Sequence, residues 1–135
     1  MKKVVFKIFL ATILCTVFCI DSYSQSECPV EIISSKKSVD ENFNLTVKAK
    51  IKNNGKVSTS NVNFVVFVNG FMHTISATCR VSVSCSPLWE TKEVTLYPQF
   101  SELEILSVKR NFESVSLGIE YIGFSDGSYW SAYDK

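Results

Sequence analysis

The segment that decides the fold is His73–Cys85, HTISATCRVSVSC. Every odd-numbered position in it is apolar or aromatic, and every even-numbered position is polar or charged. Successive side chains of a β-strand point to opposite faces, so this pattern predicts an extended segment with one dry face and one wet face. A helix, with its repeat of about 3.6 residues, would mix the two classes on every face.

The residues before this segment predict its partner strand. The run VNFVVFV occupies Val62–Val68 and leads into Asn69-Gly70. Asn-Gly readily adopts the positive φ angles of a type I′ turn, whose twist matches that of paired strands. We therefore expect a hairpin in which Val62–Val68 pairs with the chain from Phe71 onward. Apolar residues on both faces of Val62–Val68 favour a central or covered strand.

The rest of the chain gives strand patterns separated by turn signals about every ten residues. The strand candidates are residues 29–33, 43–52, 62–68, 73–85, 93–97, 103–108, 115–124 and 129–133. Residues 34–42 are polar and are expected to form a loop. The adjacent Ile105 and Leu106 interrupt the alternation and suggest a bulge. No stretch after residue 24 has a helical repeat, so we predict an all-β antiparallel sandwich or small barrel of seven or eight strands.

The first 24 residues have the pattern of a secretory signal peptide. Lysines at the start precede an apolar run from Ile8 to Ile20, and Ser22 and Ser24 supply small residues before a cleavage site. A transmembrane anchor is disfavoured because this run is shorter than the ~20 residues that a spanning helix needs. We therefore expect residues 1–24 to be removed and residues 25–135 to form one secreted, periplasmic or cell-surface domain.

The charge of the expected domain excludes a general affinity for polyanions. The whole chain has a formal net charge of +1, and the leader carries three lysines and one aspartate, which leaves −1 for residues 25–135. A near-neutral chain has no overall attraction for nucleic acid or anionic lipid. We therefore expect no nucleic-acid partner and, after cleavage, no transmembrane segment.

Three cysteines, Cys28, Cys79 and Cys85, remain after the leader. Six residues of extended chain separate Cys79 from Cys85 by ~20 Å, whereas a disulfide requires Cα atoms within ~7 Å. We expect a disulfide between Cys28 and either Cys79 or Cys85, and the alternative is three reduced thiols, two of them buried. These cysteines and the single histidine lack the close spacing of metal ligands, so no metal or cofactor is expected.

The candidates for catalytic groups have simpler structural interpretations. His73 is the only histidine, but it has the inward parity of its strand, which favours a packed histidine over a general base. Glu102 and Glu104 would share one face of a strand, as paired hydrolytic carboxylates do, but a solvated strand face explains them as well. No Gly-x-Ser-x-Gly motif is present. We predict that the protein is not an enzyme.

Alternate positions of one strand carry Lys48, Lys50 and Lys52, with Lys56 close behind. This basic stripe could dock an acidic partner or a polyanion. The alternative, which we favour, is a solvated strand whose lysines discourage pairing at a sheet edge.

The aromatic residues near the C-terminus form the main candidate for a binding site. Tyr129 and Trp130 are adjacent, so on a strand they face opposite ways and one of them should lie near solvent. With Asp126 and Tyr133, they form a candidate contact for a glycan or a protein partner. In the alternative interpretation, Trp130 fills the sandwich and Tyr129 covers an edge.

Two stretches resemble a known family. Residues 44–70 contain a predicted strand, an Asn-x-Gly turn, several small polar residues, a second predicted strand and an Asn-Gly turn, in that order. This order resembles CARDB-like domains, which are immunoglobulin-like modules of exported bacterial proteins. The tail IEYIGFSDGSYW is similar to the closing Phe-x-Asp-Gly-x-x-Trp hairpin of small bacterial β-sandwich proteins, at Phe124, Asp126, Gly127 and Trp130. The resemblance implies an immunoglobulin-like fold and a non-catalytic role, and it assigns no functional residues.

These patterns together favour an exported, non-catalytic binding or adhesion module that recognises a protein or glycan at the cell surface. The first alternative is a structural or assembly protein that pairs through an open sheet edge. The second is a small secreted hydrolase, which the absence of a catalytic motif disfavours.

Overall fold

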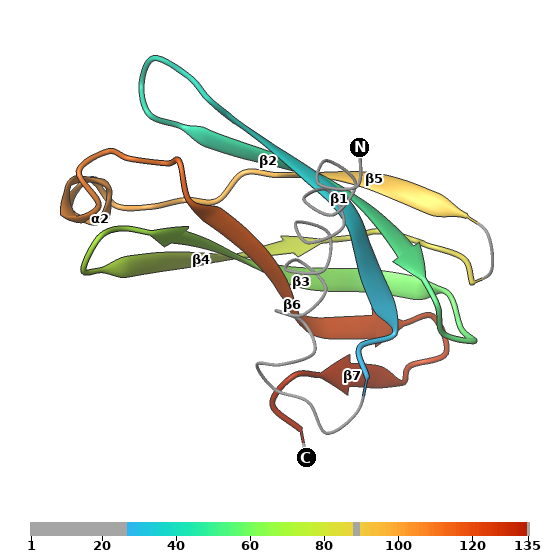
Figure 1. Ribbon diagram of the computed structural model, residues 1–135. Helices are drawn as coiled ribbons and strands as arrows, with labels where there is room; N and C mark the ends of the chain where they lie inside the picture. The colour runs from blue at the N-terminus through green and yellow to red at the C-terminus, as the bar shows by residue number, and fades with distance from the viewer. Residues whose placement is uncertain (1–26, 88–89, 135) are drawn as a thin grey trace, which may run out of the picture.

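The computed structural model describes residues 27–87 and 90–134. The expected signal peptide, residues 1–24, lies outside the described residues. The described chain folds into seven strands and one short helix, and the strands form two antiparallel sheets that pack face to face (Figure 1). The predicted all-β sandwich is therefore confirmed.

Sheet A contains three strands in the order β1-β2-β5. They span Val30–Val39, Leu45–Asn53 and Thr91–Leu96, respectively. Sheet B contains four strands in the order β4-β3-β6-β7. The bounds in chain order are Thr59–Asn69 for β3, Thr74–Val81 for β4, Val115–Phe124 for β6 and Tyr129–Ser131 for β7. The chain crosses between the sheets after β2, β4 and β5, and this division of strands is that of an immunoglobulin-like sandwich.

The core lies between the inward faces of the two central strands. β2 and β3 each place four apolar side chains inward, all of them at most 3 % exposed. These are Leu45, Val47, Ala49 and Ile51 on β2, and Val62, Phe64, Val66 and Val68 on β3. The alternation predicted for both strands is thus confirmed, and β3 has the central position that its two apolar faces suggested.

The β3–β4 hairpin forms as predicted, but its turn differs. Asn69 pairs with Thr74, so the loop has four residues, and the Gly70 amide donates a hydrogen bond to the His73 carbonyl at 2.7 Å. Neither Asn69 nor Gly70 has a positive φ angle, so the expected type I′ turn is wrong. The reason is that Asn69 remains part of the strand, where its amide donates to the carbonyl of Ser114 at 2.8 Å.

The strand predicted over residues 73–85 is confirmed for its first part only. β4 ends at Val81, and the chain then leaves the sheet and crosses toward sheet A. The odd-numbered side chains nevertheless remain the less exposed ones beyond the end of β4, since Val83 is half-buried and Cys85 is buried.

The strand predicted over residues 103–108 is wrong, because these residues belong to helix α2, Glu102–Ser107. Ser101 caps the helix: its Oγ accepts from the Glu104 amide at 3.1 Å, and the Glu104 carboxylate accepts from the Ser101 amide at 3.0 Å. This capping box satisfies two backbone donors that a helix start leaves unpaired. The adjacent Ile105 and Leu106 reflect a helical turn and not a bulge. Among the described residues, no helix is long and apolar enough to cross a membrane.

The loop predicted over residues 34–42 is also shorter than expected. β1 continues through Val39 because its backbone pairs with β2 along the whole length, with a register shift between Ile32 and Ser34. The turn follows at Asp40, whose carboxylate accepts hydrogen bonds from the amides of Asn42 and Asn44 at 2.8 and 2.9 Å. Residues 34–39 are all exposed, but Lys37 Nζ donates to the carbonyls of Phe112 and Glu113 and so connects this half of the hairpin to the chain before β6.

The capping box predicts a measurable contribution to stability. Ser101→Ala should lower the free energy of unfolding by about 1 kcal/mol, because one amide of the first turn loses its partner. Urea unfolding followed by tryptophan fluorescence measures this difference. Ser84→Ala, at an exposed serine outside the strands and the helix, serves as the control and should change stability by less than about 0.5 kcal/mol. Equal stabilities for the two variants would contradict the role of the cap.

Candidate functional site

The aromatic residues of the C-terminal hairpin are divided between the two faces of sheet B. Trp130 pairs with Ile122 and packs, half-buried, against the core. Tyr129 is exposed on the outer face and stacks on Tyr121, with ring centroids 5.7 Å apart and planes inclined by 14°. The opposite orientation of Tyr129 and Trp130 is as the alternation predicted, and Tyr129 is the exposed member of the pair.

The polar members of this hairpin support the turn and the tyrosines. Asp126 accepts hydrogen bonds from the Ser128 amide at 2.9 Å and the Ser128 hydroxyl at 2.5 Å, and these bonds hold the pKa of its carboxyl below the usual range. Tyr133 donates its hydroxyl to Glu120 at 3.1 Å. A hydrogen bond with Asp134 raises the pKa of Tyr129. Asp126 therefore shapes the turn. The exposed aromatic side chains are Tyr129, which stacks on the half-buried Tyr121, and Tyr133.

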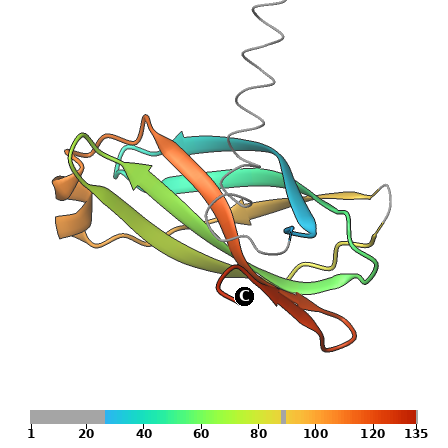
Figure 2. The same cartoon turned by 60° about the horizontal axis from the view of Figure 1, so that its bottom comes forward.

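Two neighbouring segments at one end of the sandwich carry exposed apolar side chains. Phe71 is 97 % exposed, Met72 is 88 % exposed and Leu103 is 80 % exposed, and Leu106 is also exposed. We call these four residues the apolar end. Figures 1 and 2 both show the β3–β4 loop, which carries Phe71 and Met72, beside α2, which carries Leu103 and Leu106.

Close packing connects the segments at this end. A Cβ atom on Gly70 would lie 3.1 Å from a methyl group of Val108 and 2.7 Å from the His73 carbonyl oxygen, so only glycine fits there. The guanidinium of Arg110 lies 5.1 Å from the ring centroid of Phe43, which connects the chain after α2 to the β1–β2 turn. Beneath the surface, Val108 and Phe112 are buried in the core. The backbone segments that carry the exposed side chains are thus held in place by these contacts.

The alternation pattern did not identify the apolar end. It assigned Phe71 to the start of a strand and Leu103 to a strand with a bulge. The observed register places Phe71 and Met72 beyond the last pair of the hairpin, Asn69 with Thr74. A signal was nonetheless present, because Phe71 and Met72 follow Asn69-Gly70, where polar turn residues are usual.

His73 and the two glutamates do not form a common site. His73 lies exposed in the β3–β4 loop, so the expectation that it packs inward is wrong. Glu102 and Glu104 lie in the first turn of α2 and not on one strand face, and the Glu104 carboxylate is engaged in the capping box. Among the described residues, no three His, Cys, Asp or Glu side chains gather as a metal site would require.

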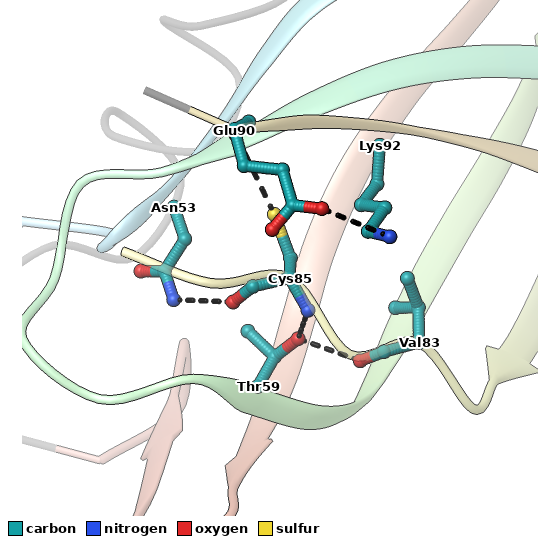
Figure 3. Close-up of polar contacts among 6 residues, drawn as sticks. All are labelled: Asn53, Thr59, Val83, Cys85, Glu90 and Lys92. Carbon is teal, nitrogen blue, oxygen red and sulfur yellow. Dashed lines mark hydrogen bonds and ion pairs between the residues drawn. The ribbon is translucent and has the colours of Figure 1, made fainter. Parts of the chain in front are cut away.

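Cys85 lies in a buried set of hydrogen bonds where the chain crosses between the sheets. Asn53 Nδ2 donates to the Cys85 carbonyl, and Thr59 Oγ1 accepts from the Cys85 backbone amide, both at 2.9 Å (Figure 3). Thr59 Oγ1 also donates to the carbonyl of Val83 at 2.6 Å. Asn53 and Thr59 are both buried, so these bonds satisfy polar groups that would otherwise destabilise the core. The set is therefore an anchor for the crossing segment.

None of Cys28, Cys79 and Cys85 forms a disulfide. The expected pairing of Cys28 with Cys79 or Cys85 is thus not present, and the structure has the alternative of three thiols. Cys28 donates its thiol to the carbonyl of Val30 at 3.3 Å, and Cys85 is buried.

Comparison of the chain with protein-family models, with curated proteins and with solved structures gave no match. The resemblance to CARDB-like domains and to the Phe-x-Asp-Gly-x-x-Trp hairpin proteins therefore stays a prediction.

The environment of the thiols predicts slow alkylation. Burial raises the pKa of the Cys79 and Cys85 thiols. Because the thiolate is the reactive form, each thiol should react with iodoacetamide at pH 8 about tenfold more slowly in the folded protein than in urea. Because the thiol pKa is higher in the folded than in the unfolded protein, it adds to the free energy of unfolding at pH values below the pKa of the unfolded thiol. This added stability is lost as the pH rises through the pKa of the folded thiol.

Peptide mass spectrometry after timed labelling measures each rate separately. Cys85 should be the slower of the two, since it is fully buried whereas Cys79 is half-buried. A disulfide-linked peptide pair, or rates equal to those in urea, would contradict the structure.

Proposed function

We propose that this protein is an exported, non-catalytic binding module whose apolar end docks a protein partner. The observation that supports the proposal most is the near-complete exposure of Phe71, Met72 and Leu103 on neighbouring segments. Monomeric soluble proteins seldom expose several large apolar side chains together, and such patches usually mark interaction sites. Export follows from the expected signal peptide and is part of the proposal.

The energetics favour a partner that buries these side chains. Fully burying a Phe, Leu or Met side chain is worth about 1.5–3 kcal/mol relative to leaving it exposed. The folded chain gains none of this from Phe71 and Met72, because the hairpin register holds them outside the core. A small number of anchored apolar or aromatic side chains can dominate the affinity of a protein interface. The apolar end therefore has the composition of an interface centre.

The nature of the side chains favours a protein over a glycan at this end. Phe71, Met72, Leu103 and Leu106 carry no hydroxyl, amide or charged group, whereas sugar recognition requires hydrogen bonds to hydroxyl groups. Loops at one end of an immunoglobulin-like sandwich commonly carry such contacts, because the sheets hold them rigidly.

A glycan contact at the C-terminal hairpin is the second candidate. The exposed Tyr129 ring stacks on Tyr121, and Tyr133 and Glu120 add polar groups nearby. An exposed aromatic face beside hydrogen-bonding groups suits stacking on a sugar ring. This candidate has less exposed apolar area than the apolar end, so we place it second.

Affinity capture tests the protein-binding proposal. The purified protein, immobilised and incubated with an extract of the cells that produce it, should retain a protein that quantitative mass spectrometry identifies. Phe71→Ser/Met72→Ser should reduce its retention by about tenfold or more, the effect of losing about 1.4 kcal/mol. The same variant should keep its free energy of unfolding within about 0.5 kcal/mol, because both side chains are exposed.

Tyr129→Ser is the matched control, since it removes an exposed aromatic ring from the C-terminal hairpin. It should retain the partner as the unmodified protein does. Equal retention by Phe71→Ser/Met72→Ser would contradict the proposal. Loss in Tyr129→Ser alone would favour the second candidate, and retention of only the protein itself would favour homotypic assembly.

A further inference from the structure

The lysine stripe of β2 does not protect a sheet edge. β2 is the central strand of sheet A, hydrogen-bonded to β1 on one side and to β5 on the other (Figure 1). The interpretation that its lysines discourage edge pairing is therefore wrong for Lys48 and Lys50. Both side chains are exposed on the outer face of the sheet.

The neighbouring strand adds a third lysine to the same face. Lys36 of β1 is the direct cross-strand partner of Lys48, so the Cβ atoms of the two like-charged side chains lie about 5 Å apart. Like charges directly opposite each other destabilise a sheet. Lys50 follows on the same face of β2, ~7 Å along the strand from Lys48. The three ammonium groups therefore concentrate positive charge on a chain whose formal net charge is only +1.

Few carboxylates offset this charge. In residues 27–87 and 90–134, the ion pair within 4 Å joins Lys92 to Glu90 at 3.0 Å, and it involves none of the three lysines. Glu93 is the register partner of Lys50 on β5 and the one carboxylate that lines the surface beside them. Lys52, by contrast, pairs in register with Glu31. Three lysines and one glutamate leave a local charge of +2.

A shallow open pocket of about 540 Å³ lies over these residues. It is lined by the three lysines together with Ser34, Ser35 and Glu93. Ser34 is the register partner of Lys50, so its hydroxyl supplies a donor and an acceptor on the same face as the lysines. The surface thus combines a depression, unpaired ammonium groups and hydroxyl groups.

We propose that this face of sheet A binds an acidic polysaccharide through Lys36, Lys48 and Lys50. Lys36 and Lys48 lie opposite each other on adjacent strands, and Lys50 lies next to Lys48 along β2. The three ammonium groups therefore form a compact basic patch, which suits an acidic chain whose carboxylate groups recur at short intervals. The pocket lining contains no aromatic ring on which a nucleobase could stack, and its lone apolar residue, Ala49, offers little to a lipid surface. The surface is separate from the apolar end, so this inference does not depend on the proposed protein partner.

Titration with polygalacturonate tests the proposal. The purified protein should bind polygalacturonate in low salt, should bind more weakly as the salt concentration rises, and should not bind uncharged dextran. Lys48→Gln/Lys50→Gln should weaken binding by about tenfold, since each lysine contacts a carboxylate. Glu93→Gln should strengthen binding, because it removes the carboxylate of the pocket.

The matched control is Lys56→Gln/Lys109→Gln, which removes the same net charge from two exposed lysines outside the pocket. It should weaken binding far less than Lys48→Gln/Lys50→Gln does, because neither lysine lines the pocket that the polysaccharide would occupy. Equal loss in both double variants would overturn the proposal, because it would reduce the effect to net charge. Absence of binding in low salt, or tighter binding of poly-glutamate or duplex DNA than of polygalacturonate, would also overturn it.

Discussion

The structure depends on burying the inward faces of β2 and β3 against each other. Each of these two strands must present an unbroken apolar row, and Ile51 of β2 and Phe64 of β3 are fully buried. Hydrophobic burial is the dominant favourable term in folding, so these rows determine which face of every neighbouring strand points inward. The outer faces of the sheets and the loops at their ends contribute little to this hydrophobic burial, so they are available for other roles.

Because the inner faces form the core, the outer faces and the loops of one small domain can present several distinct surfaces. The register of β3 with β4 ends at Asn69 and Thr74, which forces Phe71 and Met72 outside the sandwich. On the opposite sheet, the alternation that directs Ile51 inward directs Lys50 outward. Neither surface contributes apolar contacts to the core. Substitutions there should therefore separate binding from folding, which is rarely achievable at buried positions.

The period-two pattern was sufficient to predict most strands and the sandwich, because alternation is imposed directly by burial of one face. It failed where other interactions decide the local structure. The capping box of Ser101 and Glu104 favours a helix over residues 102–107. Backbone pairing alone extends β1 through exposed polar residues to Val39. For the aromatic hairpin, the sequence predicted that Tyr129 and Trp130 diverge, but the pairing of Trp130 with Ile122 decides which of them is buried.

The central claim is that the apolar end is the surface by which the protein acts. Site-specific photo-crosslinking tests it most directly, with p-benzoylphenylalanine placed at Phe71 in one chain and at Tyr129 in another, in the cells that produce the protein. The account predicts a light-dependent adduct with a distinct protein from position 71 and none from position 129. Adducts from position 129 alone, or the same adducts from both positions, would contradict it.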